Sequence, residues 1–229
     1  MVSEDSLNIA QRKMTNIIIA MQAPIRLFLS LLILSNLKVY AQQIIKEERK
    51  IILIDPGHGG VDSGTVSADG LQEKDVVLDI ARSMIAWNKG LLKSKYDIYV
   101  TRNTDTLISL DDRTKLTGYM KPDILISLHC NHSVSSKANG IEIYTYKVIN
   151  GYTEQSVRHA QTMADQLNQK LGFKNRGTKK ADFQVLRETI WFCPAILLEL
   201  GYLSNTVDLD YLKNKEKRKA LALAILMAF

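Results

Sequence analysis

Residues 50–60 read KIILIDPGHGG, a continuous apolar run that stops at a Pro-Gly pair. A strand buried on both faces has this composition, because neither of its faces meets water. The glycines that follow favour a sharp turn around His58 rather than a helix. The segment therefore predicts a central strand of a parallel sheet, followed by a loop that carries His58.

Similar signals recur on the C-terminal side of this strand. Further strands are expected at residues 97–101, 123–129, 140–146 and 195–200, where apolar or alternating runs are bounded by turn residues. Helical periodicity covers residues 75–92, 109–119 and 153–171, and two more helical segments follow before residue 229. Strands that alternate with helices of this length predict one α/β domain, a mostly parallel sheet with helices on both faces.

The composition excludes several classes of protein. The chain has 229 residues, of which 46% are hydrophobic and 24% charged, with a net charge of +6. These values exclude a disordered chain, a collagen-like repeat and a polytopic membrane protein. Two cysteines are too few for a disulfide scaffold. Because Cys130 follows one expected parallel strand and Cys193 precedes another, we expect both thiols to be free.

The excess positive charge lies at the two ends of the chain. Residues 1–41 are weakly basic, residues 213–219 (KNKEKRK) are strongly basic, and residues 42–212 hold equal numbers of basic and acidic side chains. A neutral domain gives no reason to expect a nucleic-acid partner. The basic run at 213–219 is expected to be a solvated helical face, and weak attraction to an anionic wall or membrane is the alternative.

The first 41 residues have the pattern of a secretory signal peptide. Arg26 precedes an apolar run at 27–34, and Val39-Tyr40-Ala41 ends in a small residue before Gln42. We expect cleavage after Ala41, a mature domain of residues 42–229, and export to the periplasm or the cell exterior. The alternative is an uncleaved anchor, although the run falls short of the roughly 20 residues that span a bilayer.

The two ends of the chain suggest an alternative start and a truncated C-terminus. Met14 and Met21 are alternative start positions, since the stretch before Arg26 is long for the basic part of a signal peptide. The chain ends at Phe229 within an apolar helical run, which is consistent with a domain truncated at its C-terminus.

Polar side chains follow three of the expected strands and begin the first helix. His58, His129 and Glu199 lie at or near strand ends, and Glu73 lies at the start of the helix after the His58 loop. Ligands of open α/β sheets bind at the carboxyl ends of the strands. Two histidines and a carboxylate are a common ligand set for catalytic zinc, and a second carboxylate can serve as general base.

Considered one at a time, each of these residues could instead have a structural role. A histidine after a strand can be hydrogen-bonded within the fold, and a carboxylate at a helix start is favoured by the helix dipole. Glu199 is the exception, because a carboxylate inside an apolar strand must be paired or bind a cation. We expect Arg102 and Arg113 to hold loops through hydrogen bonds to carboxylates. We expect His132 to be exposed to solvent or to lie behind a ligand, and His159 to lie at the surface.

Five ordered blocks resemble the zinc-dependent N-acetylmuramoyl-L-alanine amidases, which cleave peptidoglycan. The blocks are IILIDPGHGGVDSG, LQEKDVVLDIA, TRNTD with SLDDRT, DILISLHCN, and NRG…VLR…PAILLELGYLSN, and they extend from Ile51 to about Asn205. The resemblance implies a sheet of about six strands. It also implies one zinc ion per chain, held by His58, Glu73 and His129, with Glu199 as the catalytic carboxylate.

The resemblance further implies a substrate and a reaction. The bond cleaved would be the amide between the lactyl group of N-acetylmuramic acid and the stem peptide's L-alanine. Two alternatives stay open: a zinc hydrolase of the same fold that acts on another amide, and a catalytically silent wall-binding or regulatory protein. Cys130 and the segment Trp191-Phe192-Cys193 depart from the family pattern, and we expect neither to touch a proposed ligand. The sequence does not identify an activating partner.

Overall fold

The computed structural model describes residues 12–17, 24, 27–37, 48–149 and 151–229. The chain divides into two units, Met1–Glu48 and Arg49–Phe229. In the first unit, residues 12–17 and 27–37 are helical, and their side chains are exposed. Among the described residues, no helix combines the length and the apolar character needed to cross a bilayer. The predicted cleavage site after Ala41 lies outside the described residues.

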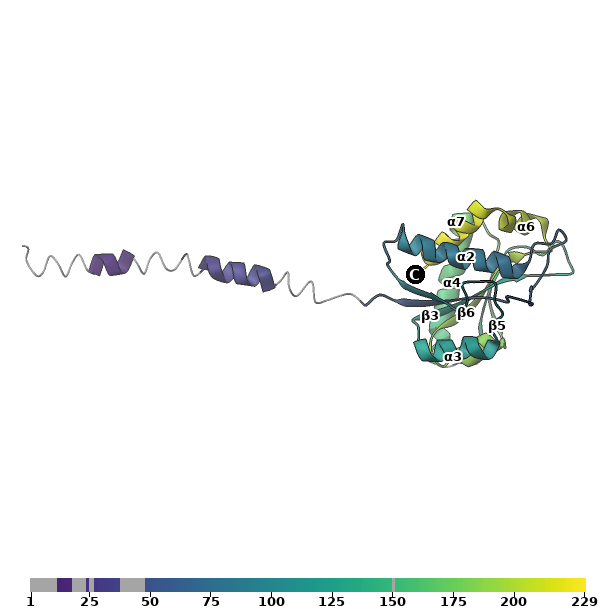
Figure 1. Cartoon of the computed structure of the whole chain (residues 1–229), viewed down its shortest axis with the longest axis horizontal. Coiled ribbons are helices and arrows are strands. Elements are labelled where there is room, and N and C mark those ends of the chain that lie inside the picture. The colour runs from purple at the N-terminus through teal and green to yellow at the C-terminus, as the bar shows by residue number, and fades with distance from the viewer. Residues whose placement is uncertain (1–11, 18–23, 25–26, 38–47, 150) are drawn as a thin grey trace, which may run out of the picture. The chain divides into compact units, whose positions relative to one another are not determined.

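The second unit is built on one six-stranded sheet, as predicted (Figure 1). The strand order is β2-β1-β3-β6-β4-β5. Only the pairing of β4 with β6 is antiparallel, and every other pair in the sheet is parallel. The strands are β1 (Ile51–Pro56), β2 (Asp97–Val100), β3 (Ile124–Asn131), β4 (Ile141–Tyr146), β5 (Asn175–Ala181) and β6 (Ala195–Tyr202).

Helices cover both faces of this sheet, again as predicted. On one face, α2 (Glu73–Lys89), α4 (Thr153–Leu171), α6 (Thr206–Lys213) and α7 (Lys215–Leu226) enclose the larger apolar core. On the other, α3 (Leu110–Met120) and α5 (Gln184–Thr189) pack over a smaller core that includes Leu53 and Leu125 (Figure 1). The central strands are therefore buried on both sides, which explains their unbroken apolar sequences.

Two elements have no counterpart among the sequence predictions. Strand β5 has the sequence NRGTKKA, which shows no apolar alternation because it lies at the sheet edge and pairs only with β4. Helix α5 has six residues, too few to display a helical period. The first long helix also begins at Glu73 rather than Asp75 and ends at Lys89 rather than Leu92.

The parallel strands determine where the thiols and the polar strand ends lie. Leu125 pairs with Ala195 at one end of the β3–β6 ladder, and His129 pairs with Glu199 towards the other. Cys193 precedes β6 at one end of this ladder, whereas Cys130 lies within β3 near the other end. Both thiols are free and buried, which confirms the prediction. The same geometry brings the carboxyl ends of β1 and β3 together with Glu199 of β6.

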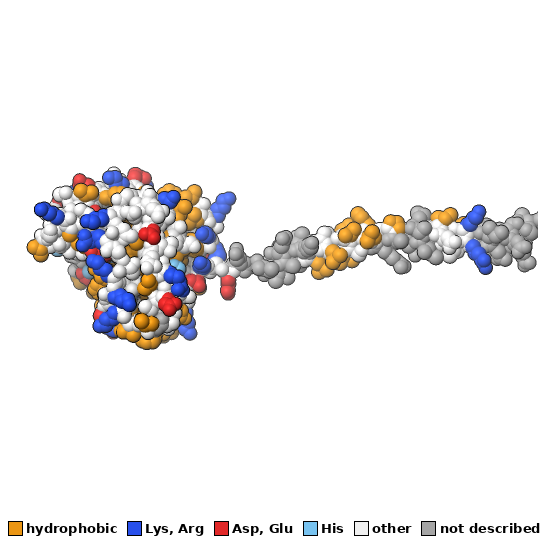
Figure 2. Space-filling model, turned by 180° about the vertical axis from the view of Figure 1, so that it is seen from behind, with side chains coloured by type: hydrophobic (Ala, Val, Ile, Leu, Met, Phe, Trp, Pro, Cys, Tyr) orange, Lys and Arg blue, Asp and Glu red, His pale blue; other side chains and the backbone are white. Residues whose placement is uncertain are grey.

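The basic run at 213–219 is only partly the solvated surface that its sequence suggests. Arg218 is buried, donating to the Asp79 carboxylate at 2.5 Å and to the Leu212 carbonyl at 2.5 Å. Lys213 forms an ion pair with Asp69, and Lys219 with Glu216. On the face of the second unit seen in Figure 2, lysine and arginine are interspersed with apolar and acidic side chains. Much of the run's charge therefore pairs within the fold.

Candidate metal centre

His58 owes its position to the glycine-rich turn after β1. Its backbone φ is 57°, a left-handed conformation that most non-glycine residues avoid. The preceding Gly57 donates its N–H to the Leu128 carbonyl at 3.0 Å, which ties the turn to the end of β3. A Cβ at Gly57 would lie 2.3 Å from Cε1 of His129. Glycine is thus required there for the two histidines to approach each other.

Asp62 orients the His58 ring, a role that the sequence analysis missed. Nδ1 of His58 lies 2.8 Å from Oδ2 of Asp62, while Nε2 faces Glu73. A hydrogen bond at one ring nitrogen sets which nitrogen is available to a metal ion. The sequence signal for this contact is an acidic residue four positions after His58 in the same short loop.

Glu73 lies at the first position of α2, where the helix dipole favours a negative charge. Its side chain is 3% exposed, and its oxygens accept from the backbone N–H of Cys130 at 2.9 Å and of Thr65 at 2.8 Å. The expectation that Cys130 touches no proposed ligand was therefore wrong for its backbone. Burial opposes ionisation, but hydrogen bonds from His129 and His58 outweigh it and lower the pKa of Glu73. The reciprocal hydrogen bond from Glu73 raises the pKa of His58 to about 9.

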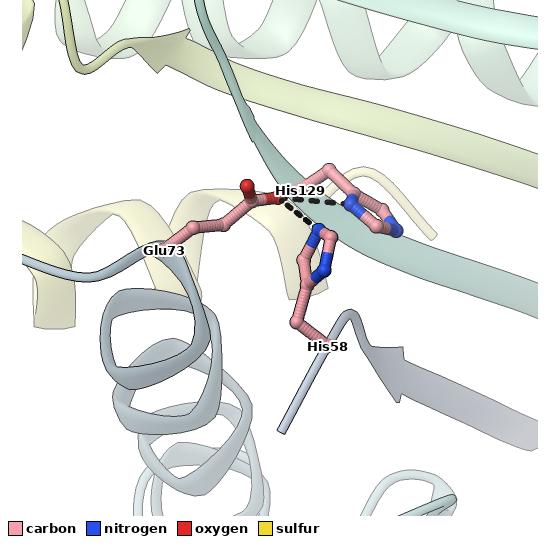
Figure 3. A group of neighbouring side chains, drawn as sticks. All are labelled: His58, Glu73 and His129. Carbon is pink, nitrogen blue, oxygen red and sulfur yellow. Dashed lines mark hydrogen bonds and ion pairs between the residues drawn. The ribbon is translucent and has the colours of Figure 1, made fainter. Parts of the chain in front are cut away.

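The three predicted ligands converge on one point. Oε1 of Glu73 lies 3.1 Å from Nε2 of His58 and 2.9 Å from Nδ1 of His129. The three candidate ligand atoms all lie within 4.8 Å of one another. Figure 3 shows the Glu73 carboxylate directed at both imidazole rings. Two imidazoles and one carboxylate at this spacing suit a catalytic zinc ion, which keeps one coordination position open.

Glu199 lies beside this cluster on β6, directly opposite His129 in the β3–β6 register. Its Oε2 atom is buried and has no hydrogen-bond partner among the described residues. Burial raises the pKa of Glu199 to about 7, with Glu73 and Glu142 adding to the rise and His129 opposing it. A carboxyl group with this pKa can both accept and donate a proton near neutral pH.

Two buried arginines hold the loop that carries His58, as predicted, but Arg102 does so through backbone carbonyls rather than the expected carboxylates. Arg102 donates to the Gly57 carbonyl at 2.7 Å and to the Lys74 carbonyl at 2.9 Å, which links the loop to α2. Arg113 donates to the His58 carbonyl at 2.9 Å and also contacts the Asp55 carboxylate. The position of His58 is therefore fixed through its backbone as well as through its ring.

The remaining histidines lie apart from the cluster. His132 is exposed, as expected. His159, expected at the surface, is instead half-buried, and its ring centroid lies 5.4 Å from that of Phe229. It also lines a cavity of about 320 Å³ with Lys50, Ile52, Asp123 and Ile124, near the amino ends of β1 and β3. That cavity therefore lies at the amino ends of the strands, whereas the three candidate ligands lie near their carboxyl ends.

Comparison with known proteins agrees with this geometry. Residues 52–229 match the family model described as N-acetylmuramoyl-L-alanine amidase. The chain belongs to this amidase family. Among curated members, it is 35% identical over 196 residues to the probable cell wall amidase LytH of Staphylococcus epidermidis. That match covers 83% of this chain and 62% of LytH, so the chain spans less than two thirds of that relative's length.

Solved amidase structures share the fold. The N-acetylmuramoyl-L-alanine amidase from Clostridium difficile 630 is 34% identical with a TM-score of 0.72, covering 80% of this chain and 95% of that one. The catalytic domain of CwlV, the amidase from Bacillus (Paenibacillus) polymyxa var. colistinus, is 32% identical with a TM-score of 0.69. That match covers 78% of this chain and 95% of the other. The amidase fold thus accounts for nearly the whole second unit.

Proposed function

We propose that this chain is a zinc-dependent N-acetylmuramoyl-L-alanine amidase acting on peptidoglycan. The observation that carries the proposal is the His58, Glu73 and His129 cluster, whose ligand atoms lie within 4.8 Å, beside the buried carboxylate of Glu199. Membership in the amidase family supports the substrate class and the type of bond. The bond cleaved would join the lactyl group of N-acetylmuramic acid to the L-alanine of the stem peptide.

His58, Glu73 and His129 would hold one zinc ion per chain. When bound, zinc lowers the pKa of a coordinated water towards about 7 and polarises a carbonyl group. The chain prepares these ligands before the metal arrives: Asp62 orients His58, and the backbone N–H groups of Thr65 and Cys130 orient Glu73. Such contacts behind the ligands fix their geometry and typically raise metal affinity.

Glu199 would move the protons in this reaction. Its unpartnered Oε2 would accept a proton from the attacking water and return it to the alanine nitrogen as the amide bond breaks. A pKa near 7 suits both tasks, because proton transfer in each direction then costs little free energy. Returning the proton matters because an amine anion is a very poor leaving group.

The test is hydrolysis of purified peptidoglycan by the zinc-loaded full chain. We expect new amino-terminal L-alanine on the released peptides, and glycan strands that keep their length. Cleavage that exposes a different amino terminus would identify a hydrolase of another amide. Binding to peptidoglycan without any new amino termini would identify a silent wall-binding or regulatory protein. Either of these results would refute the proposal.

The proposed site of action is outside the cytoplasm, where peptidoglycan lies. The signal-peptide pattern at residues 1–41 supports export, and the name of LytH places that relative at the cell wall. Mass analysis of the secreted protein would test cleavage after Ala41. A mature protein that still carries residues 27–37 would instead support the uncleaved anchor.

A further inference from the structure

The row of side chains that contains His129 and Glu199 continues across a third strand. Glu142 of β4 lies directly opposite Glu199 in the antiparallel β4–β6 pairing. Directly paired residues of neighbouring strands project from the same face of a sheet. Moving away from the candidate metal ligands, the row therefore runs from His129 through Glu199 to Glu142. Beyond Glu142 lies the edge strand β5.

Glu142 is the centre of a dense polar cluster. Its Oε1 accepts from Nε of Arg176 at 2.6 Å, from Nζ of Lys179 at 2.7 Å and from the Tyr202 hydroxyl at 2.7 Å. Its Oε2 accepts from the Tyr144 hydroxyl at 2.7 Å and from Nδ2 of Asn131 at 3.2 Å. The side chain is only 3% exposed. These contacts hold Glu142 ionised, so it is a fixed negative charge.

Two cations surround the single negative charge of Glu142. Arg176 and Lys179 share a single carboxylate, which leaves a net positive charge of one. Their side chains are 29% and 41% exposed, so this charge faces solvent. Arg176 contacts Glu142 through Nε, whereas a guanidinium binds a carboxylate best through paired N–H groups. A second acid can therefore approach the same pair of cations.

Aromatic rings border this positive surface. Nζ of Lys179 lies 5.9 Å from the centroid of the Tyr144 ring, and that ring packs edge-on against Phe183 at 5.2 Å. Phe183 is 41% exposed. An apolar wall beside two cations suits a short acidic peptide, because the backbone and carbon atoms of the peptide can pack there while its carboxylate meets the charges.

The proposed reaction indicates which half of the substrate lies here. Glu199 would protonate the alanine nitrogen, so the departing peptide must begin on the Glu199 side of the metal ligands. Strands β4 and β5 lie on that side. Three interstrand spacings of about 4.8 Å separate β3 from β5. An extended peptide advances about 3.3–3.6 Å per residue, so a few residues bridge this span.

We propose that Arg176 and Lys179 form a subsite that binds a carboxylate of the stem peptide released by the reaction. The subsite would make the chain prefer peptides with free carboxylates over peptides in which those groups are amidated. This proposal rests on the proposed amidase function, because that function sets the direction in which the peptide leaves.

The test compares two soluble substrates on the zinc-loaded full chain. One is N-acetylmuramoyl-L-alanyl-D-isoglutamyl-L-lysine with both carboxylates free, and the other is the same molecule with both amidated. We expect the wild type to have a KM roughly tenfold lower for the free acid, since charge-assisted hydrogen bonds contribute on this scale. Arg176→Met and Lys179→Met, made singly, should each raise the KM for the free acid and remove most of the preference.

Single substitutions are chosen because each leaves Glu142 one cation, whereas the double variant would strand a buried charge. Lys180→Met is the matched control. Lys180 neighbours Lys179 on β5, is exposed, and projects from the other face of the strand. The Lys180→Met variant also loses one positive charge, but it should keep the wild-type preference for the free acid. If Lys180→Met loses as much preference as Lys179→Met, the preference arises from net charge alone, and the proposed subsite is refuted.

A binding measurement separates failure of the subsite from failure of the proposed function. Calorimetry would follow the peptide L-alanyl-D-isoglutamyl-L-lysine, as free acid and as diamide, binding to the full chain. If neither muramoyl substrate is cleaved but the free acid still binds tighter, and Arg176→Met abolishes the difference, the function fails and the subsite stands. If hydrolysis occurs but neither KM nor binding distinguishes acid from amide, the function stands and the subsite is refuted.

Discussion

Glu199 lies directly opposite His129 where β3 and β6 run in parallel. This pairing places a carboxyl group with a pKa of about 7 beside the candidate metal ligands but outside the ligand cluster itself. Ligand binding and proton transfer are therefore assigned to different side chains. Substitutions can separate the two roles.

Glu199→Gln should retain zinc and lose activity. The amide has nearly the shape of the carboxylate but cannot carry a proton between water and the leaving nitrogen. We expect about one zinc per chain and a fall in kcat of roughly 10²–10⁴-fold, the usual contribution of general acid–base catalysis. Metal analysis and peptidoglycan hydrolysis measure the two effects. Turnover close to that of the wild type would show that another group moves the proton.

His58→Ala should lose zinc. It removes one of the three ligands, and a remaining His–Glu pair binds zinc far more weakly. Metal content after dialysis is the measurement. His132→Ala is the matched control, because His132 is exposed and only three residues beyond His129. Zinc retained by His58→Ala, or lost by His132→Ala, would mean that the ligands are misassigned.

Gly57→Ala should disrupt the metal centre without changing any ligand. The added Cβ would lie 2.3–2.8 Å from three atoms of the His129 ring, so the ring or the loop must shift. We expect a stability cost of about 1–3 kcal/mol, as for other overpacked sites, and weaker zinc binding. Gly151→Ala is the control, since no described atom beyond its chain neighbours lies within 4 Å of its Cβ position. Thermal unfolding and zinc titration of both variants would check this, and equal behaviour would contradict it.

Arg113→Ala should be among the most destabilising single substitutions in the second unit. Arg113 pairs with the buried Asp55 carboxylate, whose remaining side-chain partners among the described residues are the hydroxyls of Thr101 and Ser127. Stranding one member of a buried ion pair costs about 3–5 kcal/mol. Urea unfolding is the measurement, with Arg158→Ala as a control because Arg158 is exposed on α4. A cost below about 1 kcal/mol would show that Asp55 finds other donors or water.

Glu142 should make the fold sensitive to acid. Although burial opposes its ionisation, hydrogen bonds from Lys179, Arg176 and the two tyrosines lower its pKa from 4.5 to about 2. A lowered folded-state pKa contributes stability above pH 4.5, and that contribution is lost as pH falls from about 4.5 to 2. The expected loss is roughly 1–3 kcal/mol, reduced from the full shift because both cations are partly exposed.

The corresponding variant is Glu142→Gln, which does not titrate. The difference in unfolding free energy between the wild type and this variant should be largest at neutral pH. It should shrink between pH 4.5 and 2, as measured by urea unfolding at fixed ionic strength. A difference that is constant with pH would show that Glu142 is not held ionised by its partners.

Local patterns in the sequence determine the buried strands and most of the long helices. Runs such as KIILID and AILLEL are apolar throughout because helices cover both faces of the sheet, and this composition is visible without any structure. The amidase motifs likewise identify His58, Glu73, His129 and Glu199 as candidates, since their sequence blocks are specific. The structure places all four near the carboxyl ends of the central strands.

Only the tertiary structure decides what surrounds these residues. The polar sequence of β5 carries no strand signal, because an edge strand needs little apolar surface, and so its pairing with β4 could not be anticipated. The antiparallel β4–β6 pairing aligns Glu142 with Glu199, although the two residues are 57 positions apart in the chain. Hydrogen bonds and charges act over a few ångströms in space, whatever the separation along the chain. The periodicity of apolar residues therefore predicts most of the helices and strands. The packing of those elements places Asp62 against the His58 ring, buries Glu199 and forms the positive surface beside Glu142.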